Sequence, residues 1–144
     1  MIIHMDTFFP KQPPEKEEGN KEYKRYLFWN NRDKNISEIE FINRRASQML
    51  YRLLEGEGKA VYLIGVDDDG RVKSLNDKSI QETIKYVKII SKEIDANVRV
   101  IRIYKNNVCT IRLQLEENVL EIYHKNYSVE AMNLNFTKLI KSLI

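Results

Sequence analysis

The strongest pattern in the chain is an apolar run that ends in an acidic turn. Residues Ala60 to Val66 are apolar without interruption. A strand with one exposed face alternates polar and apolar residues, so this run predicts a strand that is covered on both faces. The residues from Asp67 to Gly70 predict a tight turn, because Asp bonds to nearby backbone and Gly tolerates a positive φ. Val72 to Leu75 are then expected to pair back as the second arm of a hairpin.

A helix is predicted from Ser37 to Glu55. Ser37 and Glu40 have the spacing of a capping box, in which each side chain accepts a hydrogen bond from a free backbone N–H at the helix start. Gly56 is expected to end the helix. Apolar residues at spacings of three and four form one stripe along it: Ile39, Ile42, Ala46, Met49, Leu50 and Leu53.

A second helix is predicted from Asp77 to Ile94. Its capping box would be Ser79 with Glu82, unless Asp77 is the cap. The other expected elements are a first strand at Lys21 to Trp29 that lies at a sheet edge, strands at Val98 to Tyr104, Val108 to Leu115 and Val119 to His124, and a final helix at Leu134 to Ile144.

The element order is β-α-β-β-α-β-β-β, which predicts an α+β fold. We expect a mixed β-sheet with the two main helices packed on one face. Residues 1–19 hold all three prolines and are expected to form a flexible tail. Residues 20–125 are expected to form a single α+β domain, and residues 126–144 a helical C-terminal extension.

Composition narrows the class of protein only slightly. The chain has 144 residues, enough for one domain with one core, and a mild net charge of +3. Its one cysteine, Cys109, cannot form an internal disulfide and is expected to be a buried thiol. No stretch is apolar enough to span a bilayer, and no signal-peptide core follows Met1. We therefore expect a soluble, cytoplasmic protein with no membrane partner.

Basic residues concentrate in one part of the chain. Between Lys21 and Arg52 there are eight bases and four acids, a surplus that suits an RNA phosphate backbone. In the first strand, Tyr23 and Tyr26 lie among these bases, and tyrosines can stack on unpaired bases. The simpler alternatives are a solvated helix face for the bases and a place in the core for the two tyrosines.

Familiar catalytic patterns are missing. The sequence has no G-x-x-x-x-G-K-[ST] loop for a nucleotide and no Cys/His cluster with zinc spacing. The acidic turn offers carboxylates that can bind Mg²⁺. A further carboxylate from Glu17, Glu18 or Glu22 would complete a two-metal nuclease site. A solvated turn without metal is the simpler interpretation, because Asp-rich turns are common.

Two motifs together resemble a known family. They are E-G-x-x-E-Y-K at Glu18 to Lys24 and Q-M-x-x-R-L-x-E-G-x-G-x-A-x-Y-x-I-G-V-x-D-x-G at Gln48 to Gly70. This spacing resembles the domain that precedes the GTPase in the GTP-binding protein one and two family of translational GTPases, over about Glu18 to Leu115. The chain departs from that family at Ser74, where the family has Gly, and beyond Asn126, where the P-loop of the GTPase is missing. The resemblance predicts an accessory domain that stands alone, as a natural small protein rather than a cut GTPase.

A more distant resemblance is to the Schlafen AlbA-like domain, which also pairs an E-[FY]-K strand with an I-G-V-D-D-x-G hairpin. In its nuclease members two glutamates and one aspartate form the catalytic site. The resemblance maps these roles to Glu17 or Glu18, to Glu22, and to Asp67 or Asp68. The chain lacks the Asn-Thr-x-Gly-Gly that usually precedes this hairpin.

Three functions follow as hypotheses. The first is a non-enzymatic ribosome-associated factor that binds rRNA and ribosomal proteins as a tRNA-site blocker or a hibernation-type translation regulator, without cofactor or DNA. The second is an endoribonuclease that acts on tRNA or rRNA through Glu18, Glu22 and Asp68 with Mg or Mn. The third is a protein adaptor for a separate translational GTPase. Under the first hypothesis the expected RNA contacts are Lys21, Lys24, Arg25, Arg44, Arg45, Arg52, Arg71 and Lys73.

Overall fold

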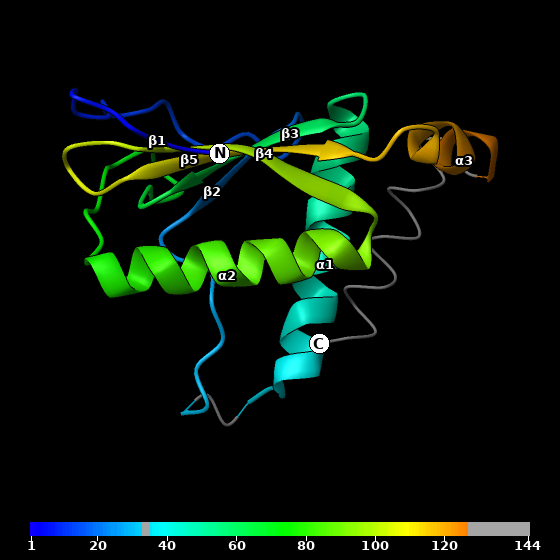
Figure 1. Ribbon diagram of the computed structural model, residues 1–144, viewed down its shortest axis with the longest axis horizontal. Coiled ribbons are helices and arrows are strands. Elements are labelled where there is room, and N and C mark those ends of the chain that lie inside the picture. The colour runs from blue at the N-terminus through cyan, green and yellow to red at the C-terminus, as the bar shows by residue number, and fades with distance from the viewer. Residues whose placement is uncertain (33–34, 127–144) are drawn as a thin grey trace.

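The computed structural model describes residues 1–32 and 35–126, which form one mixed five-stranded sheet with helices (Figure 1). The strand order is β1-β4-β5-β3-β2. The β1–β4 and β2–β3 pairs are parallel, and β5 runs antiparallel to β3 and β4. The predicted α+β class is confirmed. The elements are β1 (Ile2–His4), β2 (Lys21–Lys24), α1 (Glu38–Glu55), β3 (Lys59–Ile64), α2 (Asp77–Glu93), β4 (Ala96–Ile103), β5 (Cys109–Leu115) and α3 (Val119–Asn126).

Both long helices cover the same face of the sheet, as Figure 1 shows. Strand β3 alternates accordingly: Tyr62 and Ile64 join the main core under α1 and α2, whereas Leu63 points to the opposite face. That opposite face carries a smaller apolar cluster, which consists of the buried residues Tyr23, Leu63, Val66 and Val108. Strand β3 is therefore covered on both sides, as its apolar run predicted. None of the described helices has the length and apolar character needed to cross a membrane.

Local sequence signals set the helix ends. Ser37 caps α1, and its hydroxyl accepts a hydrogen bond from the Glu40 amide at 3.1 Å, as predicted. Helix α2 is capped by Asn76, whose side-chain oxygen accepts from the Ser79 amide at 2.8 Å. The predicted caps at Ser79 and Asp77 are therefore wrong. Asn caps at least as well as Asp, and here it lies one residue earlier in the chain.

The second arm of the hairpin is nearly absent. The turn itself forms, with the Gly70 amide donating to the Asp67 carbonyl at 2.8 Å. After it, the ladder consists of one isolated bridge between Val66 and Val72. The predicted strand at Val72 to Leu75 is wrong because the chain leaves its partner: the Leu75 amide donates to the Asn107 carbonyl, beside β5, at 3.0 Å.

Residues 1–19 do not form a separate tail. Ile2–His4 is a strand of the sheet, paired with β4. Residues 5–19, the N-terminal strap, then cross to β2 at the other edge of the sheet. Along the way Phe9 packs in the smaller apolar cluster, the Gln12 amide donates to Gly70, and the Glu15 amide donates to Asp68. The expectation of a flexible tail is wrong because backbone pairing to the acidic turn anchors a proline-rich segment that has no periodicity of its own.

Two other predicted strands differ from what the structure shows. Strand β2 lies at the sheet edge as expected but ends at Lys24, because the chain then turns toward α2 and the Leu27 amide donates to the Thr83 hydroxyl at 3.1 Å. The stretch Val119–Asn126 is a helix instead of a strand. Asn118 takes a positive φ of 70° just before it, and Leu120 and Tyr123 pack against the core from one helical face. The predicted helix at Leu134 to Ile144 lies outside the described residues.

Candidate nucleic-acid interface

Glu22 of the first motif and Arg52 of the second motif form a buried ion pair. Glu22 on β2 points toward α1, while the next residue, Tyr23, points to the other face of the sheet. The Arg52 Nε lies 2.6 Å from a Glu22 carboxylate oxygen, and the two residues are 4% and 3% exposed. Charges that are buried to this extent are tolerated only when paired and hydrogen-bonded. The pair therefore fixes α1 against the edge of the sheet.

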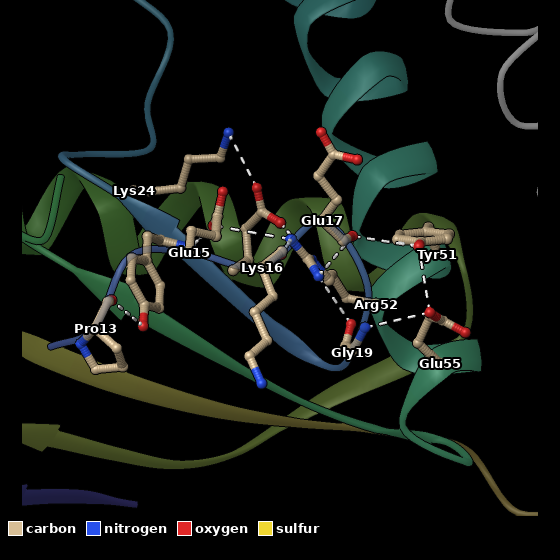
Figure 2. Close-up of polar contacts among 11 residues, drawn as sticks. Pro13, Glu15, Lys16, Glu17, Gly19, Lys24, Tyr51, Arg52 and Glu55 are labelled. Carbon is tan, nitrogen blue, oxygen red and sulfur yellow. Dashed lines mark hydrogen bonds and ion pairs between the residues drawn. The ribbon is translucent and has the colours of Figure 1, made fainter. Parts of the chain in front are cut away.

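The rest of the Arg52 guanidinium holds the N-terminal strap (Figure 2). Its Nη1 donates to the carbonyls of Glu17 and Gly19 at 3.1 and 2.9 Å, and its Nη2 donates to the carbonyl of Lys16 at 2.9 Å. The Glu15 carboxylate lies 3.9 Å from Nη2. Every guanidinium nitrogen is thus engaged inside the protein. The prediction of an exposed RNA contact at Arg52 is wrong.

The carboxylates expected of a nuclease are not gathered into a site. Glu18 and Asp68 are exposed, whereas Glu22 is buried and faces Arg52 as well as the Lys24 ammonium at 3.5 Å. Within residues 1–32 and 35–126, no three His, Cys, Asp or Glu side chains lie close enough together to hold a metal ion. Glu22 is consequently the counterion of two cations in this structure, a role that the sequence pattern alone did not distinguish from catalysis.

Four of the predicted RNA contacts are exposed: Lys21, Arg25, Arg71 and Lys73. The backbone brings two of them to one place. The Lys24 carbonyl accepts from the Gly65 amide at 2.8 Å, and the Gly65 carbonyl accepts from the Lys73 amide at 2.6 Å. The end of β2, with Arg25, and the chain after the acidic turn therefore flank the same glycine. We call Lys21, Arg25 and Lys73 the basic edge. Arg71 is not included in the basic edge, because its guanidinium Nε lies 3.3 Å from a carboxylate oxygen of Asp69.

A second pair of cations, Lys24 of β2 and Arg45 of α1, lies on the side of β2 that carries Glu22. Burial lowers the pKa of Lys24, the positive charge of Arg45 lowers it further, and Glu22 opposes both effects. Arg45, from α1, has its guanidinium carbon 5.4 Å from the centroid of the Phe41 ring, and no described residue forms an ion pair or a hydrogen bond with it. The neighbouring Arg44 pairs with Glu40 at 4.0 Å. Lys24 therefore has Glu22 as a counterion, whereas the described residues supply none for Arg45.

The two tyrosines of the first motif have different roles. Tyr23 is 5% exposed, packs in the smaller apolar cluster, and donates its hydroxyl to the Pro13 carbonyl at 3.0 Å. Its predicted stacking on RNA is wrong, and the core alternative is confirmed. Tyr26 is 52% exposed and lines a cavity with Phe28 and Trp29 that the sequence reasoning missed. The signal was present as a run of aromatic residues directly after the basic strand.

Comparison with known proteins finds similarity to part of a larger GTP-binding protein. No protein-family model matches the chain. It is 37% identical over 93 residues, or 65% of its length, to GTP-binding protein 2 of Mus musculus and of Homo sapiens. That match covers only 14% of the relatives, so the chain spans a small part of their length. It is also 34% identical over 71 residues, 49% of this chain and 38% of the relative, to Uncharacterized protein R625 of Acanthamoeba polyphaga mimivirus.

These similarities support the resemblance to a GTP-binding protein over part of the chain. The Schlafen resemblance stays a prediction. In the structure, the motif residues that carry the first resemblance serve mainly the interior: Glu22 with Arg52, and the buried Met49, Leu53 and Tyr62. These motif residues accordingly serve the fold, and the three residues of the basic edge lie outside the fixed positions of the two motifs.

Proposed function

We propose that this chain is a non-enzymatic, ribosome-associated factor that binds rRNA through its basic edge. The observation that carries the proposal is that the chain at Arg25 and at Lys73 flanks Gly65, with Arg45, for which the described residues supply no counterion, near Lys24. The resemblance to an accessory domain of translational GTPases supplies the ribosomal setting, and the similarity to part of GTP-binding protein 2 supports it.

Contacts of this kind act through phosphates and carry little sequence information. A ribosomal RNA surface offers many phosphates in a fixed arrangement, so a few well-placed cations suffice to dock a small domain. A bound protein that performs no reaction leaves its site at a rate set by dissociation alone. Such a protein would occupy a tRNA site or another functional surface until displaced, which is the behaviour of a hibernation-type translation regulator.

Sedimentation of cell extract through a density gradient tests the proposal. In low salt the protein is expected to travel with ribosomes. About four phosphate contacts would lower the affinity roughly 100-fold between about 50 and 200 mM salt, so raised salt should move it to the top of the gradient. A protein that stays at the top even in low salt would contradict the proposal.

Nuclease treatment separates RNA binding from protein binding. Limited digestion of exposed rRNA before sedimentation is expected to release the protein at constant salt. If the protein instead keeps a partner after the RNA is removed, and Arg25→Glu leaves that complex intact, the chain is an adaptor for another protein and the RNA-binding proposal is wrong.

A further inference from the structure

An open cavity of about 370 Å³ lies between the segment that follows β2 and the start of α1. Its volume falls within the roughly 300–1,000 Å³ that is usual for small-ligand sites. Four of the eight residues around it are aromatic, and one is a cation. The eight residues are Tyr26, Leu27, Phe28, Trp29, Asn30, Ile36, Phe41 and Arg45.

Packing contacts and a hydrogen bond hold the aromatic walls in place. The Trp29 indole N–H donates to the Ile36 carbonyl at 3.2 Å. Phe41 packs edge-on against Tyr86, with ring centroids 5.7 Å apart and planes at 86°. The rings of Tyr26 and Phe28 lie 4.7 Å apart, and Tyr26 keeps 52% of its surface exposed. A flat ligand that enters therefore meets aromatic surface that is already positioned.

The charge at the wall selects the kind of ligand. Arg45 has a buried Nε without a hydrogen-bond partner, and the described residues supply no carboxylate for its guanidinium. The ammonium of Lys24 is close enough for the Arg45 charge to lower its pKa. A cationic ligand, such as a methylated amine in an aromatic cage, would be repelled. An anion with a flat aromatic part would satisfy both the rings and the guanidinium.

We propose that this cavity takes one unpaired nucleotide, with its base stacked on the aromatic wall and its phosphate on Arg45. That the nucleotide belongs to RNA rests on the proposed function. That the cavity recognises a base and a phosphate does not depend on it. Stacking tolerates any base, because every base has a π-face, so the site is expected to favour single-stranded over paired RNA and to show little base preference. The basic edge would then hold the neighbouring phosphates.

Trp29 is the only tryptophan in the chain, so its fluorescence reports directly on the cavity. A single-stranded ten-residue oligoribonucleotide is expected to quench this fluorescence in a saturable way, and a blunt RNA duplex is not. Uridine monophosphate is expected to quench far more weakly. If the mononucleotide binds as tightly as the oligonucleotide, RNA is not the source and that part of the proposal is overturned.

Two variants change the wall without removing a buried apolar side chain. Tyr26→Ala takes away one stacking surface, and Arg45→Gln takes away the cation; each is expected to weaken oligonucleotide binding roughly 10-fold. The matched controls are Phe8→Ala, an aromatic residue that is 69% exposed on the N-terminal strap, and Arg99→Gln, an exposed cation on β4. Equal affinities in variants and controls would overturn the proposal. Unchanged melting temperatures would show that the variants fold.

The failure of this proposal is distinguishable from failure of the proposed function. If the protein travels with ribosomes but Trp29 fluorescence does not respond to the oligonucleotide, the cavity proposal is wrong and the basic edge stands. If the oligonucleotide quenches Trp29 and both variants weaken it, the cavity proposal is supported even when no ribosome association is found.

Discussion

Replacing Arg52 by Met is expected to lower the free energy of unfolding by about 3–5 kcal/mol. The substitution keeps most of the apolar stem but leaves the Glu22 carboxylate buried at 3% exposure without the partner that lies 2.6 Å away. It also removes the donors that satisfy the carbonyls of Lys16, Glu17 and Gly19. Urea unfolding followed by circular dichroism measures the change, which corresponds to a fall of about 10 °C or more in melting temperature.

The control for this substitution is the exposed arginine of the acidic turn. Arg71→Met breaks an ion pair whose side chains are 70% and 55% exposed, and is expected to change stability only within about 0.5 kcal/mol. The double variant Arg52→Met with Glu22→Gln should recover part of the loss, because the carboxylate is no longer charged. A loss below about 1 kcal/mol for Arg52→Met alone would show that the buried pair does not hold α1 and the strap together.

Replacing Gly70 by Ala is expected to lower the free energy of unfolding by about 3 kcal/mol and to loosen the N-terminal strap. Gly70 has a φ of 91°, and a Cβ built on it would lie 1.9 Å from the Gln12 carbonyl oxygen and 2.8 Å from the Pro13 carbonyl oxygen. Both neighbouring oxygens belong to the backbone, so the strap must move away, and the Gln12–Gly70 hydrogen bond of 2.9 Å is lost. Cleavage by trypsin after Lys11 and Lys16 should become several-fold faster.

Gly19 provides the matched control. It has a similar φ of 92°, but a Cβ there meets nothing within 4 Å. Gly19→Ala therefore carries the conformational cost alone, about 1–2 kcal/mol. If Gly70→Ala costs no more than Gly19→Ala, and trypsin cleaves both variants at the same rate, the strap does not depend on close approach to the acidic turn.

Short-range signals were sufficient for the parts of the fold that are decided locally. The cap at Ser37 and the apolar run of β3 need only the residues beside them, and both are confirmed. The strand predicted at Val119 to His124 failed because six residues of mixed polarity fit either a strand or a helix. Leu120 and Tyr123 contact core residues that lie outside this stretch, and these contacts favour a helix.

The site was harder to predict because its charges are sorted by tertiary contacts. Arg45 and Arg52 are seven residues apart on one helix and look alike in sequence. Arg52 meets Glu22, thirty residues earlier, and becomes interior, whereas Arg45 lies over the Phe41 ring and has no ion pair with any described residue. The strap was missed for the same reason: its hydrogen bonds go to residues such as Asp68 and Gly70, which no local pattern connects to prolines near the N-terminus.

The most direct test of the account is the salt dependence of binding between the purified chain and purified ribosomes. The variant carries Lys21→Glu, Arg25→Glu and Lys73→Glu, and the control carries three equivalent reversals on other exposed cations, Lys78→Glu, Lys88→Glu and Arg99→Glu. We expect the slope of log affinity against log salt to fall by about 0.9 for each lost phosphate contact in the variant only, with a loss of affinity of at least about 100-fold in low salt. Equal slopes and affinities for variant and control would contradict the claim that the basic edge binds rRNA.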